Sequence, residues 1–311
     1  MMPSGPRGLI HQALLYETAD QFLASAVPFV SEGLHRGDAV IAVTSDVNAE
    51  LLRQNLNGNG DNVTFIEASQ WYDAPGRTLA AYHRHVDRLH QETLRVIGEP
   101  VWVGLDALET SQWSRYESVV NVSLAAAPAR IMCGYDRRSL PAAVLDDALR
   151  THPELAVGVE SRPSVTYADP AVYYAEHNSV LTERPVDGIE QLTIYTDLAP
   201  MRAFIAHHAP TMGIPADRLD DFILAINEIA TNAIRHGGGS ADVRLWATER
   251  RVICEVHDSG TIADQPFLGF LRPDPRAERG HGLWIARQLC DLLEIHAGQP
   301  GTTVRMHIRR L

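Results

Sequence analysis

The stretch Phe222–Gly239, FILAINEIATNAIRHGGG, decides the fold of the second half of this chain. Its apolar residues recur at helical spacing and predict an amphipathic helix over Ala216–His236. The apolar stripe consists of Leu219, Phe222, Ile223, Ile226, Ala230, Ala233 and Ile234. Glu228, Asn232 and His236 follow at intervals of four on a different face. A carboxylate, a carboxamide and an imidazole stacked in this way suit a metal-bound phosphate and a general base, and a solvated helix face is the alternative.

Three segments after this helix have residue types that suit a ligand. Asp258 and Gly260 lie in HDSG at the end of a predicted strand, where a carboxylate accepts from an exocyclic amine and a glycine admits a flat ring. An ordinary turn is the alternative. The stretch RGHGL, Arg279–Leu283, leads into a helix whose backbone N–H groups suit phosphate. A loop-to-helix hinge is the alternative there. A third segment, Gly301-Thr302-Thr303, offers hydroxyls or simply enters an edge strand.

The elements around these segments predict an α+β two-layer domain, because paired strands alternate in polarity while the helices are gathered elsewhere. The strands are expected at Leu192–Tyr195, Val243–Ala247, Val252–His257 and Thr303–Ile308, and the further helices at Pro200–His208 and Leu283–Leu293.

The first half alternates strands with helices, which predicts a mostly parallel sheet covered on both faces. Expected strands are Ala13–Tyr16, Ala39–Thr44, Val63–Glu67, Pro100–Leu105 and Ala129–Tyr135. Expected helices are Asp20–His35, Asn48–Asn55, Arg77–Val96, Trp113–Ala126 and Pro141–Arg150. After these elements the alternation of strands and helices is no longer evident, and several prolines interrupt the sequence. We therefore expect domains at 1–165 and 188–311, joined by a linker at 166–187.

Composition excludes several classes of protein. The 311 residues have a formal net charge of −12, which disfavours direct binding to nucleic acid or to anionic membranes. The first ten residues contain no apolar run, so no secretory signal is expected, and no stretch is apolar enough to span a bilayer. Three widely spaced cysteines form neither a disulfide framework nor a zinc ribbon. A cytoplasmic protein is expected.

Taken in this order, the four segments of the second half resemble the nucleotide-binding domain of gyrases, heat-shock chaperones, sensor histidine kinases and mismatch-repair ATPases, the Bergerat fold. NEIATNAIRHG is most similar to the bacterial anti-sigma factor serine kinases. The resemblance covers about Asp187–Leu311. It implies that Glu228 is the general base and Asn232 the Mg²⁺ ligand, and that Asp258 binds the adenine amino group. The residues implied to contact ATP are Asn232, His236, Asp258, Gly260, Gly280, Gly282, Leu283 and Thr303.

This sequence departs from that family pattern after the second motif. Ile262 stands where a further glycine is frequent, and the expected lid, Thr261–Arg279, contains three prolines.

The first half resembles the sensory domain named for methanogens, methylotrophs and a dichloromethane-responsive regulator (MEDS), which is similar to RecA-like ATPases. The stretches HQALLYETADQFLASAVPFVSEGLHRGDAVIAVTS, GEPVWVG, RIMCGYDRRSLP and RTHPEL carry this likeness, over about Leu9–Tyr174. A RecA-like ATPase requires a glycine-rich loop with lysine after its first strand, whereas Tyr16–Asp20 contains neither residue type. We therefore expect one ATP per chain and a sensing or docking role for this half.

Four histidine and aspartate positions leave their roles open. His83, Asp87 and His90 have a spacing that suits zinc on one helix, although a solvated face is the favoured interpretation. His152 either caps a helix or lies at a domain interface.

The resemblances together imply a cytosolic regulator whose sensory domain, with a small-molecule signal, controls an Mg-ATP-dependent serine kinase. Its partners would be a sigma factor and a STAS-type anti-anti-sigma protein, and a homodimer is possible in this class. One alternative is an ATP-binding module that sequesters a partner without transferring phosphate. The other is the catalytic half of a two-component histidine kinase, although the nearest acceptor, His177, lacks the usual following acidic residue.

Overall fold

A computed structural model describes residues 8–90, 92–177, 181–262, 266–274, 276, 280–298 and 301–310. The chain divides into two compact units. The first comprises Met1–Asp73 and Thr78–His177, and the second comprises Ala74–Arg77 and Asn178–Leu311. Within the described ranges, no helix combines the length and the apolar character that crossing a membrane requires.

The first unit is built on a seven-stranded sheet of order β3-β2-β4-β5-β1-β6-β7. Its strands are β1 (Ile10–Tyr16), β2 (Ala39–Thr44), β3 (Thr64–Glu67), β4 (Leu94–Gly98), β5 (Ala129–Asp136), β6 (Glu154–Val157) and β7 (Glu160–Pro163). Every neighbouring pair is parallel except β6 and β7. The mostly parallel sheet confirms the predicted fold class.

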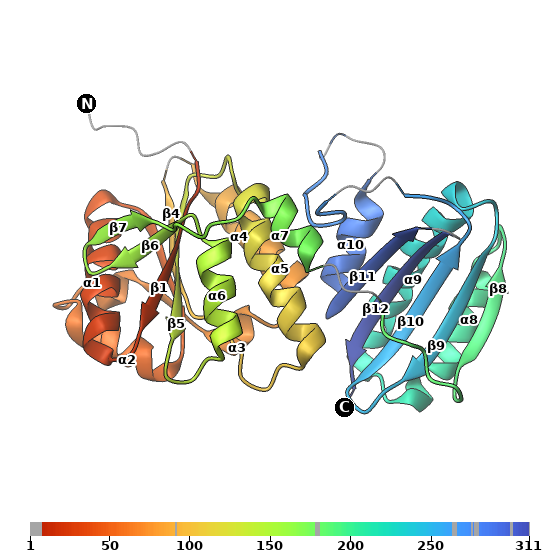
Figure 1. The fold of residues 1–311 in the computed structure, drawn as a ribbon. Helices are drawn as coiled ribbons and strands as arrows, with labels where there is room; N and C mark the ends of the chain where they lie inside the picture. The colour runs from red at the N-terminus through yellow and green to blue at the C-terminus, as the bar shows by residue number, and fades with distance from the viewer. Residues whose placement is uncertain are drawn as a thin grey trace. The chain divides into compact units, whose positions relative to one another are not determined.

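Helices cover both faces of this sheet, with α1 and α2 on one side and α5 and α6 on the other (Figure 1). The helices are α1 (Ala19–Arg36), α2 (Asp46–Asn55), α3 (Ala68–Trp71), α4 (Pro75–Arg88), α5 (Ala107–Ser123), α6 (Ala142–Thr151) and α7 (Pro170–Glu176), with a 3₁₀ turn at Gly60–Asn62. Because side chains alternate along a strand, Leu14 and Met132 join the core under α1, whereas their neighbours face α5 and α6.

The fourth strand differs from its predicted position. The sequence predicted a helix to Val96 and a strand at Pro100–Leu105, whereas β4 occupies Leu94–Gly98. The sequence pattern did not reveal this strand because a charged residue, Arg95, interrupts its apolar run. The Arg95 side chain is fully buried and donates to Asp38 Oδ2 at 2.8 Å and to the Phe29 carbonyl at 2.9 Å.

The boundary of the first unit also differs from the expected one. The hairpin β6–β7 completes the sheet, and α7, expected to lie in the linker at 166–187, belongs to the first unit.

The second unit is a five-stranded antiparallel sheet, in the order β11-β12-β10-β9-β8, with its helices packed on one face (Figure 1). Its strands are β8 (Glu190–Ile194), β9 (Ala241–Ala247), β10 (Arg251–Asp258), β11 (Leu292–Gly298) and β12 (Gly301–Arg309). Its helices are α8 (Ala199–His208), α9 (Leu219–His236) and α10 (His281–Leu289), with 3₁₀ turns at Pro210–Met212 and Ala216–Arg218. This arrangement confirms the predicted two-layer α+β sandwich.

One strand of the second unit was missed. The helix predicted over Leu283–Leu293 ends at Leu289, and β11 begins at Leu292. The turn between them depends on Asp291, whose carboxylate accepts from the Arg309 backbone N–H at 2.7 Å and pairs with Arg218 at 3.2 Å. Both partners are distant in sequence, so the local pattern could not reveal this turn.

Candidate active site

Helix α9 presents its polar face to two cavities while its apolar face joins the core. Phe222, Ile226 and Ala230 are completely buried against the sheet. Glu228 and Asn232 are half-buried, one turn apart, as their spacing predicted. The helix ends at Gly237, whose N–H donates to the Ala233 carbonyl. The rigid packing of one face fixes where the other face holds its carboxylate and amide.

The two cavities differ in character and share Asn232 and His236. The first has a volume of about 320 Å³ and mostly apolar walls. It is lined by Ile229, Asn232, Ala233, His236, Asp258, Gly260, Thr261, Ile262, Leu283, Thr302 and Val304. The second, of about 690 Å³, is more polar and is lined by Glu228, Thr231, Asn232, Arg235, His236, Gly280, His281 and Gly282. Together they suit a ligand with an aromatic base at one end and phosphates at the other.

Asp258, at the end of β10, is the carboxylate of the apolar cavity. Its Oδ1 accepts from the Gly260 N–H at 2.8 Å. Burial raises the pKa of Asp258, against the opposing effect of that hydrogen bond. A Cβ added at Gly260 would lie 2.5 Å from the His236 carbonyl, so the end of α9 and the loop after β10 meet only because this residue is glycine.

Gly280 and Gly282 form the start of α10 beside the polar cavity. Gly280 is the N-cap and has a φ of +96°, a conformation that favours glycine. A Cβ added at Gly282 would lie 2.9 Å from Glu228 Oε2 and 3.1 Å from Asn232 Nδ2. The helix start therefore lies directly against the two side chains of α9 that the motif singled out.

The expected contact from Thr303 is replaced by one from Thr302. Thr302 and Val304 are among the described residues that line the apolar cavity, and Thr303 is not. The Thr302 hydroxyl donates to the Gly260 carbonyl at 2.8 Å and accepts from the Ile262 N–H at 3.3 Å. Thr303 pairs instead with His257 Nδ1 at 2.9 Å. Adjacent residues of a strand point to opposite faces, so an error of one residue in register exchanges the two threonines.

Other predicted site residues lie where the motifs placed them. Leu283 lines the apolar cavity, and His236 borders both cavities. Sequence reasoning missed Arg235 and His281, which bring cationic or titratable groups to the polar cavity. Arg235 directly precedes His236, and His281 lies between the two motif glycines, so their places in the motifs could have identified them. Ile262, a departure from the family pattern, is part of the apolar wall.

The expected lid is described only in part. Residues 263–265, 275 and 277–279, including Pro275 and the Arg279 of the glycine motif, lie outside the described residues. The part at 266–270 is attached to α10 through Arg287. Its guanidinium donates to the Leu268 carbonyl at 3.0 Å and lies 3.8 Å from the centre of the Phe270 ring.

In the first unit, the strand ends where a RecA-like ATPase would bind phosphate hold side chains that bond to one another. Thr18 caps α1 by accepting from the Gln21 N–H at 3.2 Å. Glu99 accepts from the Tyr16 hydroxyl and from Asn48 Nδ2, each at 2.6 Å. Burial raises the pKa of Glu99, against the effect of these two donors. Side chains of the protein thus occupy the strand ends where a RecA-like ATPase holds phosphate.

The remaining histidines that the sequence singled out lie in separate places. His83 bonds to the Ser123 hydroxyl at 2.9 Å, and His90 lies beyond the end of α4, so the helical face that would unite them with Asp87 ends before His90. His177 is the C-cap of the short helix α7, with its ring stacked on Tyr173. His152 is the C-cap of α6 and is completely buried.

Comparisons with known proteins match both halves of the chain. The model of the MEthanogen/methylotroph, DcmR Sensory domain (MEDS) matches residues 10–153, and that of the histidine kinase-like ATPase domain matches residues 194–308. Serine-protein kinase RsbW of Bacillus velezensis is 30% identical over 119 residues, 34% of this chain and 74% of that protein. RsbW of Bacillus licheniformis is 31% identical over 121 residues, with the same shares. The crystal structure of the RsbU and RsbW domains of Rv1364c from Mycobacterium tuberculosis is 24% identical, covering 39% of this chain and 32% of that chain with a TM-score of 0.29.

Proposed function

This chain belongs to the RsbW family of anti-sigma serine-protein kinases, with a MEDS domain ahead of its histidine kinase-like ATPase domain, and we propose that it phosphorylates a serine of an anti-anti-sigma protein. The phosphoryl donor is ATP with Mg²⁺, and the substrate is a small protein of the STAS type. The other partner is a sigma factor that the kinase sequesters. The MEDS domain controls this activity in response to a small-molecule signal.

The observation that carries the proposal is the contact of α9 with the start of α10. Gly282 brings backbone N–H groups of a helix start beside Glu228 and Asn232, at the polar cavity. A helix N-terminus favours phosphate through its free N–H groups and its dipole. The apolar cavity that adjoins it has the Asp258 carboxylate to accept from an adenine amino group. The residues present therefore fit a nucleoside triphosphate.

Asn232 is the residue that would hold Mg²⁺, because its amide oxygen is a hard ligand and it belongs to both cavities. The bound ion would neutralise charge on the phosphates. Arg235 and His281 add positive or titratable groups to the same cavity.

Glu228 is the general base of the proposed reaction. Its carboxylate lines the polar cavity. It would take the proton of the substrate serine as the serine oxygen attacks the γ-phosphorus of ATP and ADP leaves. The phosphoserine formed carries a charge of about −2 and disrupts a packed interface through repulsion and desolvation. The modified antagonist then no longer displaces the sigma factor from the kinase.

The test is the variant Glu228→Gln, assayed with labelled ATP and candidate STAS-type proteins of the same genome. The amide keeps the shape of the side chain and removes its basicity. We expect ATP affinity to be retained and transfer to fall by ~10²–10⁴. Glu249→Gln, at an exposed position in the β9–β10 turn, is the matched control and should transfer at the wild-type rate.

The alternatives appear as distinct outcomes of this assay. Equal turnover in Glu228→Gln would make Glu228 structural. ATP binding by the wild type without transfer to any partner would favour a sequestering module. Acid-labile phosphate on the product, in place of acid-stable phosphoserine, would favour a histidine kinase. A cytoplasmic location belongs to the proposal and is supported by three cysteines that are all buried and free.

A further inference from the structure

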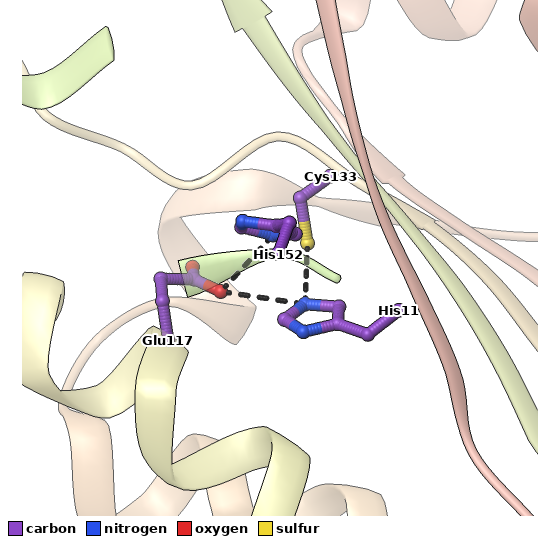
Figure 2. A group of neighbouring side chains, drawn as sticks. All are labelled: His11, Glu117, Cys133 and His152. Carbon is purple, nitrogen blue, oxygen red and sulfur yellow. Dashed lines mark hydrogen bonds and ion pairs between the residues drawn. The ribbon is translucent and has the colours of Figure 1, made fainter. Parts of the chain in front are cut away.

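Four side chains with metal-binding atoms meet in the interior of the first unit. His11 comes from β1, Cys133 from the adjacent strand β5, Glu117 from α5, and His152 from the end of α6. Figure 2 shows all four pointing toward one another. None is more than 3% exposed. The mechanism proposed for the second unit uses none of these residues.

Three of the distances between their ligand atoms lie between 3.5 and 3.7 Å. His11 Nε2 lies 3.5 Å from Cys133 Sγ and 3.6 Å from Glu117 Oε2, and His152 Nε2 lies 3.7 Å from the same carboxylate oxygen. All four ligand atoms lie within 4.8 Å of one another. Glu117 Oε1 and His152 Nε2 are buried and lack a hydrogen-bond partner. Buried polar atoms are rarely left so, and an ion is one reason for it.

Hydrogen bonds outside the cluster determine which imidazole nitrogens face inward. His11 Nδ1 is 3.0 Å from Asn121 Oδ1, and the Asn121 amide nitrogen donates to the Thr151 carbonyl at 2.7 Å. His152 Nδ1 is 2.8 Å from the Ala148 carbonyl. Both Nδ1 atoms therefore carry the proton and donate, which leaves the Nε2 lone pairs directed at the cluster. Hydrogen bonds from the other ring nitrogen to groups outside the site orient histidines that bind metals.

We propose that His11 Nε2, His152 Nε2, Cys133 Sγ and a Glu117 carboxylate oxygen bind one divalent transition-metal ion, with zinc as the preferred ion. Tetrahedral zinc bonds of ordinary length separate neighbouring nitrogen, oxygen and sulfur ligands by about 3.3–3.6 Å, which the observed separations approach. Imidazole and thiolate ligands select zinc over magnesium or calcium. The anionic carboxylate and thiolate balance the charge of the ion.

Without an ion, the donor among these four side chains is the Cys133 thiol, which lies 3.5 Å from His11 Nε2. The His152 Nε2 lone pair and the Glu117 carboxylate would then face each other as acceptors, 3.7 Å apart. This arrangement suits two ligands that share an ion between them.

The site has the character of a structural centre. It has four protein ligands, is closed to solvent, and joins two strands and two helices of the MEDS domain. Closed four-ligand sites stabilise a fold, whereas catalytic zinc retains an open position. The ion would therefore hold α5 and α6 to the sheet.

The experiment uses the whole 311-residue chain, purified without chelators, with metal content measured by mass spectrometry. We expect close to one zinc per chain, and after growth or refolding with Co²⁺ an absorption band from thiolate to cobalt charge transfer. A zinc content far below one equivalent per chain, even after incubation with Zn²⁺ and desalting, would overturn the site. Full cobalt occupancy without the thiolate band would overturn it equally.

Variants identify the ligands. Cys133→Ala and His152→Gln should each lose the bound ion, whereas Cys254→Ala, which removes a buried thiol of the other unit, should keep it. Metal that persists in both ligand variants would contradict the assignment. Far-UV circular dichroism and a melting curve report whether each variant has folded. If the ligand variants fail to accumulate, the wild-type cobalt spectrum still decides between the outcomes.

Discussion

Gly282 determines how closely α10 approaches the polar face of α9. No side chain separates its backbone from Glu228 and Asn232, and the atoms that an added Cβ would meet are the ends of those two side chains. The fold can yield to such a Cβ by moving them. The proposed catalytic machinery cannot, because these groups define the polar cavity.

Gly282→Ala should therefore separate stability from function. Alanine is a better helix former than glycine by up to about 1 kcal/mol, so thermal unfolding should not shift downward. The affinity for Mg-ATP should fall by roughly tenfold or more, since moving both groups costs at least about 1.4 kcal/mol of binding. Calorimetric titration and a melting curve measure the two effects. Gly60→Ala, where an added Cβ makes only ordinary contacts, is the control for glycine replacement. Unchanged affinity would show that α10 does not take part in binding.

Strand β12 illustrates how one element supplies different surfaces from adjacent residues. Thr302 joins the loop after β10 to the strand through Gly260 and Ile262. Thr303 contacts His257 on the other side of the sheet. The alternation of the strand thus assigns one threonine to the apolar cavity and the other to a separate surface.

The variants Thr302→Val and Thr303→Val test which of the two threonines belongs to the cavity. Valine at 302 leaves the half-buried Gly260 carbonyl without its donor, a cost of about 1 kcal/mol. We expect ATP affinity to fall by roughly tenfold, because the displaced loop lines the cavity. Thr303→Val should bind ATP as the wild type does. Titration of both variants with ATP measures the two affinities. A weaker affinity in Thr303→Val than in Thr302→Val would show that Thr303 is the threonine of the site.

The two units of the chain differ in what they offer a triphosphate. The ATPase domain has two adjoining cavities beside a helix start. In the MEDS domain, the N-terminus of α1 is capped by Thr18, and Asp20 adds negative charge in its first turn. The Glu99 network occupies the neighbouring strand ends. These groups would repel phosphate. Acidic side chains, and side chains that hydrogen-bond to one another, stand where a phosphate loop has backbone donors and a lysine.

The 311-residue chain should accordingly bind one ATP. Asn232→Ala should abolish Mg-dependent binding altogether, whereas Asn48→Ala, in the Glu99 network, should leave the affinity unchanged. Calorimetric titration with and without magnesium supplies the stoichiometry. A saturable site that survives Asn232→Ala and is lost in Asn48→Ala would make this a protein with two nucleotide sites.

The amino-acid pattern was sufficient wherever an element is stabilised by its own periodicity. The apolar stripe of α9 and the alternation of β9 and β10 are properties of consecutive residues, so these elements could be placed without coordinates. The positions of Glu228, Asn232 and His236 along the helix follow from the same regularity. Both fold classes could also be predicted, because the order of helices and strands restricts the topology.

Contacts between distant residues decided the rest. Arg95 is tolerated inside β4 because Asp38 and the Phe29 carbonyl accept hydrogen bonds from it, and no local pattern reports those partners. The choice between Thr302 and Thr303 required the register of β12 against β10. His11, Glu117, Cys133 and His152 are spread over most of the first unit and meet only because β1 pairs with β5 beneath α5 and α6. Such convergence depends on which strands become neighbours, and strand pairing is a property of the packed chain because its free energy comes from residues that the sequence keeps apart.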